Sequence, residues 1–289
     1  MSADNLLEKV KQLREITGVG FKDCKNAIDE TKGDIEKSIE FLRKKGIAKA
    51  SKRMSRVASE GLVCIYEKDN KFSMIELNSE TDFVAKNNEF VNFAEEISRL
   101  GIDNLGDSQK ILESKMRNKK NVKDNLISLI TKIGEKITLR RAAYIENGKN
   151  KNFSYIHSSL KKNVGKLGVL LSLETTKPVN EISALGKQLT MQIAASAPLA
   201  IDKEDLDKNL LSKEKEIITE ELKNSGKDIK IIEKITVGKL NKFISENTLL
   251  NQDWVMEPQK KVKDVIKEIA GKDNIKIKQF IRFKVGEGI

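Results

Sequence analysis

The stretch "GLVCIYEKDNKFSMIELNSE", residues 61–80, decides the fold class, because here the hydrophobic pattern changes to the period of two that is typical of β-strands. Two apolar runs, 61–66 and 72–78, flank a polar segment that contains Asp69-Asn70. Asp and Asn tolerate the positive φ of a tight hairpin turn. The sequence therefore predicts an antiparallel β-hairpin with its turn at 68–71.

A helix and a later strand are predicted to complete this unit. The segment 88–100, "NEFVNFAEEISRL", has helical spacing of its apolar residues, with Asn87 or Asn88 as a candidate N-cap. After further charged helical segments, "ITLRRAAYI" predicts a strand at 137–145. On the helix predicted at 88–100, the face that we expect to be buried consists of Phe90, Phe93, Ala94, Ile97 and Leu100.

The same order of elements then occurs a second time. Residues 153–175 predict another hairpin, 180–198 its following helix, and 262–287 a late helix and closing strand. The repeated order predicts an α+β fold with two subdomains, each with helices over a small antiparallel sheet. We expect the first subdomain to span 56–146 and the second 147–289.

The N-terminal part reads as a three-helix module. Helical spacing within 5–46 is interrupted by "GVG" at 18–20 and by "KGD" at 32–34. The third helix is predicted to end before Gly46, and 47–60 to form a helical or extended linker. We therefore expect a module with its linker at 1–55, whose small core suits binding better than catalysis.

The second subdomain is predicted to contain an inserted helical hairpin at 204–248. This region is charged and helical in period, and "NSGKD" at 224–228 is a turn signal between two helices. The seam between the helices is expected to consist of Leu210, Ile217, Ile218, Leu222, Ile231, Ile235 and Leu240.

Charge alone does not single out a partner. The 289 residues carry a net charge of +11, but the lysine excess is dispersed among acids and its clusters, 43–53 and 115–120, are short. Only 5% of residues are aromatic, and no run interleaves Phe or Tyr with Arg as a base-stacking platform would. A solvated surface is the simpler explanation, so no specific nucleic-acid partner is expected, and a basic RNA-binding accessory protein is kept as the alternative function.

The residues that carry most enzyme chemistry are sparse. His157 is the single histidine and has no recognisable nucleophile motif, so it is expected to be packed or hydrogen-bonded on a strand. No phosphate loop or dinucleotide fingerprint is present. Cys24 and Cys64 lack a CxxC partner and are expected to be small buried hydrophobes. These observations favour a non-enzymatic binding protein without metal or cofactor.

A cytosolic location is also expected. No apolar run reaches the roughly 18 residues that a membrane helix needs. The first residues, "MSADNLLEKVKQLREITG", mix acids and bases through their apolar positions and match neither a signal nor a transit peptide.

Three apolar features have no evident place in a core, and each also has a structural explanation. Phe83 in "NSETDFVAKNNEF" (78–90) could fold back onto its own sheet, and Phe21 could belong to the core of the helical module. The residues Trp254, Val255 and Met256 of "DWVMEP" could form an edge strand that ends at Pro258. The alternative is that these side chains are displayed for a partner.

Seven segments together resemble one family. In chain order, and covering nearly the whole sequence, they are "LREITGVGFKDCKNAI", "NSETDFVAKNNEF", "KIGEKITLRRAA", "GKLGVLLSL", "MQIAASAP", "DWVMEP" and "FIRFKVGEGI". They are similar to the bacterial elongation factor Ts family, the nucleotide exchange factors of elongation factor Tu. The segments "TDFVAKN" and "IRFKVGEG" are the most specific of the seven.

The resemblance implies a role for the TDFV loop. In the family this loop protrudes toward the GTPase domain of Tu, and its Phe enters between two helices near the bound magnesium. Carried onto this sequence, Phe83 is the wedge, Asp82 is its polar neighbour, and Thr81 and Val84 shape the loop. The implied activity is the release of GDP from Tu·GDP and stabilisation of nucleotide-free Tu.

The resemblance also implies further contacts with Tu. The N-terminal module is similar to ubiquitin-associated domains and is expected to touch the GTPase domain, while the 204–248 hairpin resembles the protruding coiled coil of the family and is a possible site of self-association. The implied contact residues are Arg14, Phe21, Lys25, Ile133, Gly134, His157, Val255 and Met256.

Three features depart from the family pattern. Phe21-Lys22 stands where relatives often carry two apolar residues, so the contact of the N-terminal module with Tu is expected to be more polar here. "HSSLKKNVGKLG" (157–168) is longer and poorer in glycine than the family's turn, which affects the placement of His157. The sequence stops at Ile289 directly after "VGEG", so contacts of the extra C-terminal helix of some relatives are expected to be absent or replaced.

Overall fold

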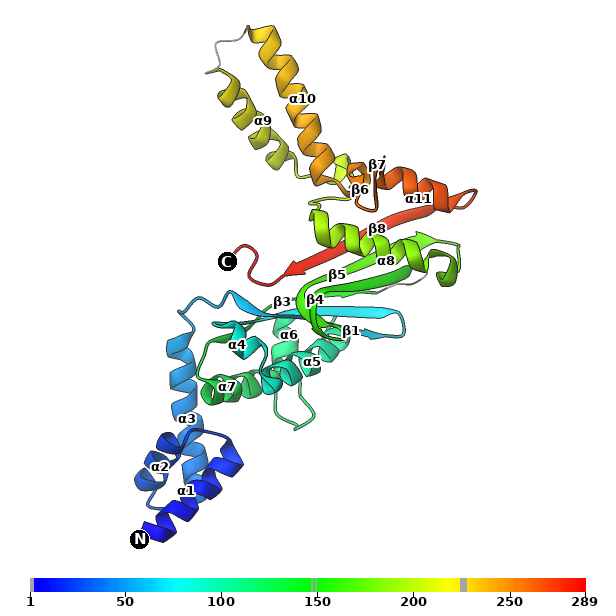
Figure 1. Cartoon of the computed structure of the whole chain (residues 1–289). Coiled ribbons are helices and arrows are strands. Elements are labelled where there is room, and N and C mark those ends of the chain that lie inside the picture. The colour runs from blue at the N-terminus through cyan, green and yellow to red at the C-terminus, as the bar shows by residue number, and fades with distance from the viewer. Residues whose placement is uncertain (1–2, 147, 149, 224–227) are drawn as a thin grey trace.

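The computed structural model describes residues 3–146, 148, 150–223 and 228–289, which form a mixed helical and stranded fold (Figure 1). The predicted α+β class is confirmed: N-terminal helices precede antiparallel strands that carry helices on their faces. Within the described part of the chain, no helix combines the length and the apolar character needed to cross a membrane.

The N-terminal module consists of α1 (Ala3–Thr17), α2 (Phe21–Glu30) and α3 (Ile35–Arg53). The turn between α1 and α2 requires Gly18, whose φ is +65°. Asp34 caps α3 by accepting a hydrogen bond from the Lys37 N–H at 3.0 Å. The small core of the module contains Val10, Leu13, Cys24, Ala27, Ile28 and Leu42.

The predicted end of the third helix before Gly46 is wrong, because α3 continues to Arg53. Gly46 is the point where α3 lies against α7 (Val122–Ile133), and a Cβ at Gly46 would lie only 2.6 Å from the Thr131 Oγ1. The glycine is therefore required by close helix packing and does not mark a helix end. The first half of the predicted linker, 47–53, is therefore helical.

The first hairpin is confirmed. It consists of β1 (Glu60–Lys68) and β2 (Lys71–Ser79), with Lys68 opposite Lys71. Asp69 and Asn70 both have positive φ, as a two-residue hairpin turn requires. The third strand, β3 (Ile137–Ile145), has the predicted bounds and pairs with β2.

Three helices cover one face of these strands: α5 (Asn88–Asp103), α6 (Ser108–Glu113) and α7. Asn87 caps α5 by accepting from the Glu89 N–H at 2.8 Å, which settles the choice between Asn87 and Asn88. The predicted face of α5 packs into the core of this half, which also contains Leu62, Ile75, Leu77, Ile111, Val122, Ile130 and Ile137.

The second half repeats this arrangement with β4 (Lys151–Lys161), β5 (Val164–Thr175) and β8 (Ile275–Lys284). Its helices are α8 (Val179–Ser196) and α11 (Val262–Ala270). Alternate residues of β5 face these helices, and the core of this half includes Leu167, Val169, Leu171, Leu173, Ile182, Leu185, Leu189, Ile193, Val262 and Ile266.

The two small sheets are joined, which the sequence did not indicate. β1 pairs with β5 through Val63–Gly165 and Cys64–Val164, giving a six-stranded sheet in the order β3-β2-β1-β5-β4, with β8 also on β5. A second apolar cluster lies away from the helices and contains residues of both halves: Val63, Ile65, Phe72, Met74, Ile145, Leu170 and Phe283. The expected boundary between 146 and 147 stays a prediction, and residue 147 lies outside the described residues.

A buried carboxylate also connects the halves. Glu76 on β2 is fully buried and accepts hydrogen bonds from Arg140 Nη1 at 3.0 Å and Arg141 Nε at 2.6 Å. It further accepts from the side chain of Asn78 at 3.1 Å and from the Gly286 N–H at 3.0 Å. The segment after β8 is thereby attached to the first half of the molecule.

The helical hairpin projects from the second half (Figure 1) and consists of α9 (Lys208–Lys223) and α10 (Ile229–Asn247). Ile218, Leu222 and Ile232 are buried along its seam, as partly predicted. Ile217 and Ile231 are exposed by 60% and 50%, so their assignment to the seam is wrong. In the pairs Ile217-Ile218 and Ile231-Ile232, only the second residue is buried in the seam. The helical spacing of the sequence could not decide which isoleucine of each pair faces the seam. Residues 224–227 of the predicted turn lie outside the described residues.

Short elements complete the second half. Two 3₁₀ turns, η1 (Lys203–Asp205) and η2 (Leu249–Asn251), flank the base of the helical hairpin. They are followed by a small hairpin of β6 (Asp253–Trp254) and β7 (Glu257–Lys261). The predicted edge strand ending at Pro258 is wrong, because β7 runs through Pro258 and Val255-Met256 form the connection.

Candidate functional site

Phe83 is displayed by a short helical turn, α4 (Asp82–Ala85), directly after β2. Its side chain is 80% exposed, so the explanation that it folds back onto its own sheet is wrong. The next two residues, Val84 and Ala85, are buried in the core of the first half. Since the buried residues directly follow Phe83, the core holds this turn while its aromatic side chain faces solvent.

Asp82 lies beside Phe83 and forms an ion pair with Lys86, one helical turn later, at 2.8 Å. The hydrogen bond from Lys86 is the main cause that lowers the pKa of Asp82 below its usual value. Asp82 therefore presents a negative charge next to the exposed ring at neutral pH.

Two carboxylates connect the start of this turn to the segment that follows α7. Glu135 accepts from the Thr81 N–H at 3.0 Å and from the Thr81 hydroxyl at 2.7 Å. In return, Glu80 accepts from the Lys136 N–H at 2.6 Å and from Arg56 Nη1 at 3.2 Å. We call this reciprocal arrangement of Glu80, Thr81, Glu135 and Lys136 the carboxylate clamp.

The sequence reasoning missed both carboxylates of the clamp. The available signal was their position, since Glu80 directly precedes "TDFV" and Glu135 directly follows "KIG". Nothing in the local pattern indicates that residues 54 positions apart share hydrogen bonds.

The clamp brings Ile133 and Gly134 close to the Phe83 turn. Gly134 ends α7 with φ of +94° and donates its N–H to the Ile130 carbonyl at 2.9 Å. The side chain of Ile133 is half-buried against the core of the first half. The end of α7 thus places two of the predicted contact residues near the Phe83 turn.

The predicted contact residues of the module lie on its surface. Arg14 is exposed on α1, and Phe21 and Lys25 lie one turn apart on the exposed side of α2. The explanation that Phe21 belongs to the core of the module is wrong, because 44% of Phe21 is exposed.

The module rests on α7, the same helix that ends near the Phe83 turn. Arg53 Nη1 donates to the Ile130 carbonyl at 2.9 Å. A Cβ on Gly18 would lie 2.7 Å from Cε of Lys132, whose ammonium pairs with Glu89 at 2.5 Å. The helix α7 therefore supports both the module and the Phe83 turn.

The remaining predicted contacts lie on the second half. His157 is exposed on β4, and its Nδ1 is 3.0 Å from the Tyr155 hydroxyl, so it is hydrogen-bonded but not packed in a core. Val255 and Met256 are exposed at the tip of the β6–β7 hairpin, beside a buried Trp254. The Val255 N–H donates to Oε1 of Gln192 at 2.8 Å. Figure 1 shows this hairpin on the opposite side of the sheets from α4.

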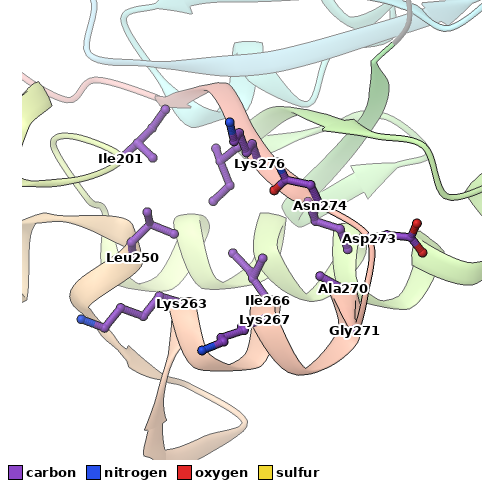
Figure 2. Close-up of a pocket in the computed structure, with 12 residues that line it drawn as sticks. Ile201, Leu250, Lys263, Ile266, Lys267, Ala270, Gly271, Asp273, Asn274 and Lys276 are labelled. Carbon is purple, nitrogen blue, oxygen red and sulfur yellow. The ribbon is translucent and has the colours of Figure 1, made fainter.

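A groove of about 370 Å³ lies elsewhere, between α11 and the start of β8 (Figure 2). Ile201, Leu250 and Ile266 contribute apolar surface, and lysines such as Lys263 and Lys267 line its edge. None of the predicted contact residues lines this groove. In the described ranges, no three His, Cys, Asp or Glu side chains are grouped so that they could hold a metal ion.

Comparison with known proteins gives a consistent result over nearly the whole chain. The family model "Elongation factor TS" matches residues 80–287. Elongation factor Ts of Methylorubrum populi is 42% identical over 283 residues, covering 97% of this chain and 92% of the relative. Elongation factor Ts of Nitrobacter hamburgensis and that of Rhodospirillum centenum are each 39% identical to this chain. Each alignment covers 97% of this chain and 92% of the relative.

Proposed function

Since the chain belongs to the elongation factor Ts family, we propose that it acts in translation elongation as a guanine nucleotide exchange factor for elongation factor Tu. In this proposal the protein binds Tu·GDP, opens the magnesium and phosphate site, and stabilises nucleotide-free Tu until GTP enters. It does so by binding, without a covalent step of its own.

One observation carries the proposal at the level of residues: Phe83 is 80% exposed on a turn whose next residues are buried. An exposed aromatic ring on a fixed support is suited to enter a space between two helices of a partner. Magnesium requires near-ideal octahedral geometry at short distances, so a small shift of its surroundings weakens its binding and that of the nucleotide.

The size of the effect follows from the burial of the ring. Burying a Phe side chain contributes roughly 1.5 to 3 kcal/mol. Each 1.36 kcal/mol changes a rate about tenfold, so the wedge would account for about one to two decades of faster GDP release. Any larger acceleration must come from other contacts.

Those other contacts are proposed to lie on separate parts of the chain. Arg14, Phe21 and Lys25 of the module, together with Ile133-Gly134, would touch the GTPase domain near the wedge. His157 and the Val255-Met256 tip would bind more distant parts of Tu. Such a divided surface can bind Tu and distort its nucleotide site at the same time. Because coupling between ligands is reciprocal, GDP must weaken the binding of this protein as much as the protein weakens that of GDP.

The proposal is tested by stopped-flow release of a fluorescent GDP from purified elongation factor Tu, at fixed magnesium, with this protein titrated in. We expect the release rate to rise with protein concentration and then saturate. A release rate that stays at the value for Tu alone, with both proteins folded, would overturn the proposed function.

A further inference from the structure

We infer that Glu135, with Glu80 as its counterpart, is a positioning residue for exchange: the carboxylate clamp holds the Phe83 turn in the conformation that acts on the partner. This inference rests on the proposed function and deepens it. Neither glutamate needs to touch the partner for the clamp to act.

Every polar group of Thr81 is hydrogen-bonded, two of them to the clamp residue Glu135. Glu135 accepts from the Thr81 N–H at 3.0 Å and from its hydroxyl at 2.7 Å. The Thr81 carbonyl accepts from the Ser79 hydroxyl at 2.9 Å. With its N–H, hydroxyl and carbonyl all bonded, Thr81 keeps the extended conformation from which α4 begins.

Both oxygens of the Glu135 carboxylate are engaged in holding Thr81. Among the described residues, Glu135 forms no ion pair, and both of its oxygens bond to Thr81. Hydrogen bonds to an ionised acceptor are shorter and stronger than those between neutral groups. This arrangement differs from the Asp82–Lys86 pair, in which both side chains are largely exposed.

The two ends of the turn are held in different ways. Val84 and Ala85 are held by burial in the core, whereas Thr81 is held by the clamp. Glu80 reinforces the same junction by accepting from the Lys136 N–H, and Lys136 Nζ donates to the Arg56 carbonyl at 2.7 Å. Without Glu135 the buried end remains in place, but the start of the turn gains freedom that must be lost again when Phe83 enters the nucleotide site of the bound partner.

Loss of the clamp is expected to affect only the contact that Phe83 makes with the partner. Contacts made by the module and by the β6–β7 tip do not depend on the conformation of Thr81. Loss of the clamp is therefore expected to lower the maximal rate of GDP release while leaving the protein concentration at half-saturation nearly unchanged. A general loss of folding would instead lower the fraction of active protein.

The test uses the full chain with Glu135→Ala and Glu135→Gln in the GDP-release assay. We expect Glu135→Ala to lower the maximal release rate about tenfold, because a charge-assisted bond is removed from each of two donors. Glu135→Gln retains one acceptor oxygen and is expected to recover most of this loss. The matched control is Glu95→Ala, which removes one negative charge from the same half but only breaks a pair with Lys161.

A double-mutant cycle with Phe83→Ala tests whether Glu135 acts through the wedge. If it does, Glu135→Ala should change the rate less than about twofold once Phe83 is absent. An equal tenfold loss in both backgrounds would overturn the inference, because Glu135 would then act independently of Phe83.

Amide hydrogen exchange of the free protein provides a readout that needs no partner. The amides of Thr81 and its neighbours should exchange faster in Glu135→Ala than in wild type, while amides of β1 stay unchanged. Unchanged exchange at Thr81 would overturn the clamp even if GDP release slowed. If the wild type failed to accelerate GDP release, the proposed function would fall and the positioning role with it, whereas faster Thr81 exchange would still show the clamp.

Discussion

At the scale of a single residue, Phe83 lies outside the core of the fold. Its ring makes little contact with the rest of the chain, because 80% of it is exposed, while Val84 beside it belongs to the core. Exposed side chains contribute little to stability, so a change at Phe83 is expected to affect the partner and not the fold.

We therefore expect Phe83→Ala to slow GDP release from Tu by about one to two decades. Its free energy of unfolding should stay within about 0.5 kcal/mol of wild type in urea titrations. The control is Leu105→Ala, since Leu105 is 66% exposed in the loop after α5 and should affect neither quantity. Equal release rates for Phe83→Ala and wild type would remove Phe83 from the wedge role.

Glu76 shows the opposite case, a residue whose importance lies in the fold. Burial alone would raise the pKa of Glu76, but the Gly286 N–H, the Asn78 side chain and the two arginines together hold it below its ordinary value of 4.5. A carboxylate whose pKa is lowered by folding stabilises the native state at pH values above its ordinary pKa. That contribution is lost as the pH falls through the lower pKa of the folded state.

Glu76→Gln is expected to lower the free energy of unfolding by about 2 kcal/mol at neutral pH. This loss of stability is smaller than the loss expected when a wholly buried ion pair is broken, because the side chains of Arg140 and Arg141 still reach solvent. Urea titrations over a range of pH should show this difference in full above pH 4.5 and a shrinking difference below it. A difference that stayed constant into acid would mean that the charge of Glu76 does not matter.

At the scale of elements, the same residue type has different effects in two helices. Gly46 and Gly238 both lie inside long helices, where glycine is intrinsically unfavourable. A Cβ at Gly46 would meet the Thr131 side chain at 2.6 Å, whereas nothing lies within 4 Å of one at Gly238. Only the packing of α3 on α7 distinguishes them.

Alanine substitutions at these two glycines form a matched pair. Gly238→Ala is expected to stabilise α10 by up to about 1 kcal/mol. For Gly46→Ala, the contact with Thr131 should offset that gain. Gly46→Leu should lower the free energy of unfolding by about 1 to 3 kcal/mol and loosen the module from α7. Thermal unfolding followed by circular dichroism gives the stabilities, and faster proteolysis in the segment after Arg53 would report the loosening. If Gly46→Ala and Gly238→Ala raised the free energy of unfolding equally, α3 and α7 would be able to move apart without loss of stability.

At the scale of the whole molecule, the described part of the helical hairpin is joined to the second half at its base. There Ala200, Leu206 and Ile244 form one small apolar cluster, while Ile218, Leu222 and Ile232 form another along the seam. Ile217, Ile231 and Val237 remain exposed on its surface. These residues are the candidates for contacts between copies of the chain.

We expect any self-association of the free protein to depend on this hairpin. The triple variant Ile217→Ser, Ile231→Ser, Val237→Ser should lower the concentration-dependent mass in sedimentation experiments. The control replaces three exposed apolar residues elsewhere, Val179, Leu199 and Ile269, with serine. Association that persisted in the first variant and vanished in the control would place the contact outside the hairpin.

The sequence by itself determined the main helices and strands and their order. The turn at Asp69-Asn70 and the strand 137–145 depend on neighbours within a few residues, so local patterns were sufficient to predict them. For the cap of α5 the same patterns left Asn87 and Asn88 open, and the structure selects Asn87. The exposed candidates Phe83 and Phe21 stood out because no nearby periodicity assigned them to a core. Between Ile217 and Ile218, and between Ile231 and Ile232, the same patterns could not choose.

Only the tertiary structure decided how these elements are joined. The pairing of β1 with β5, the bond from Gly286 to Glu76 across 210 positions, and the clamp between Thr81 and Glu135 all connect distant parts of the chain. A buried polar group must find a partner when water is excluded, but its own sequence neighbourhood does not specify which one. The elements follow from local physical chemistry, whereas the support of the Phe83 turn exists only once the chain has folded.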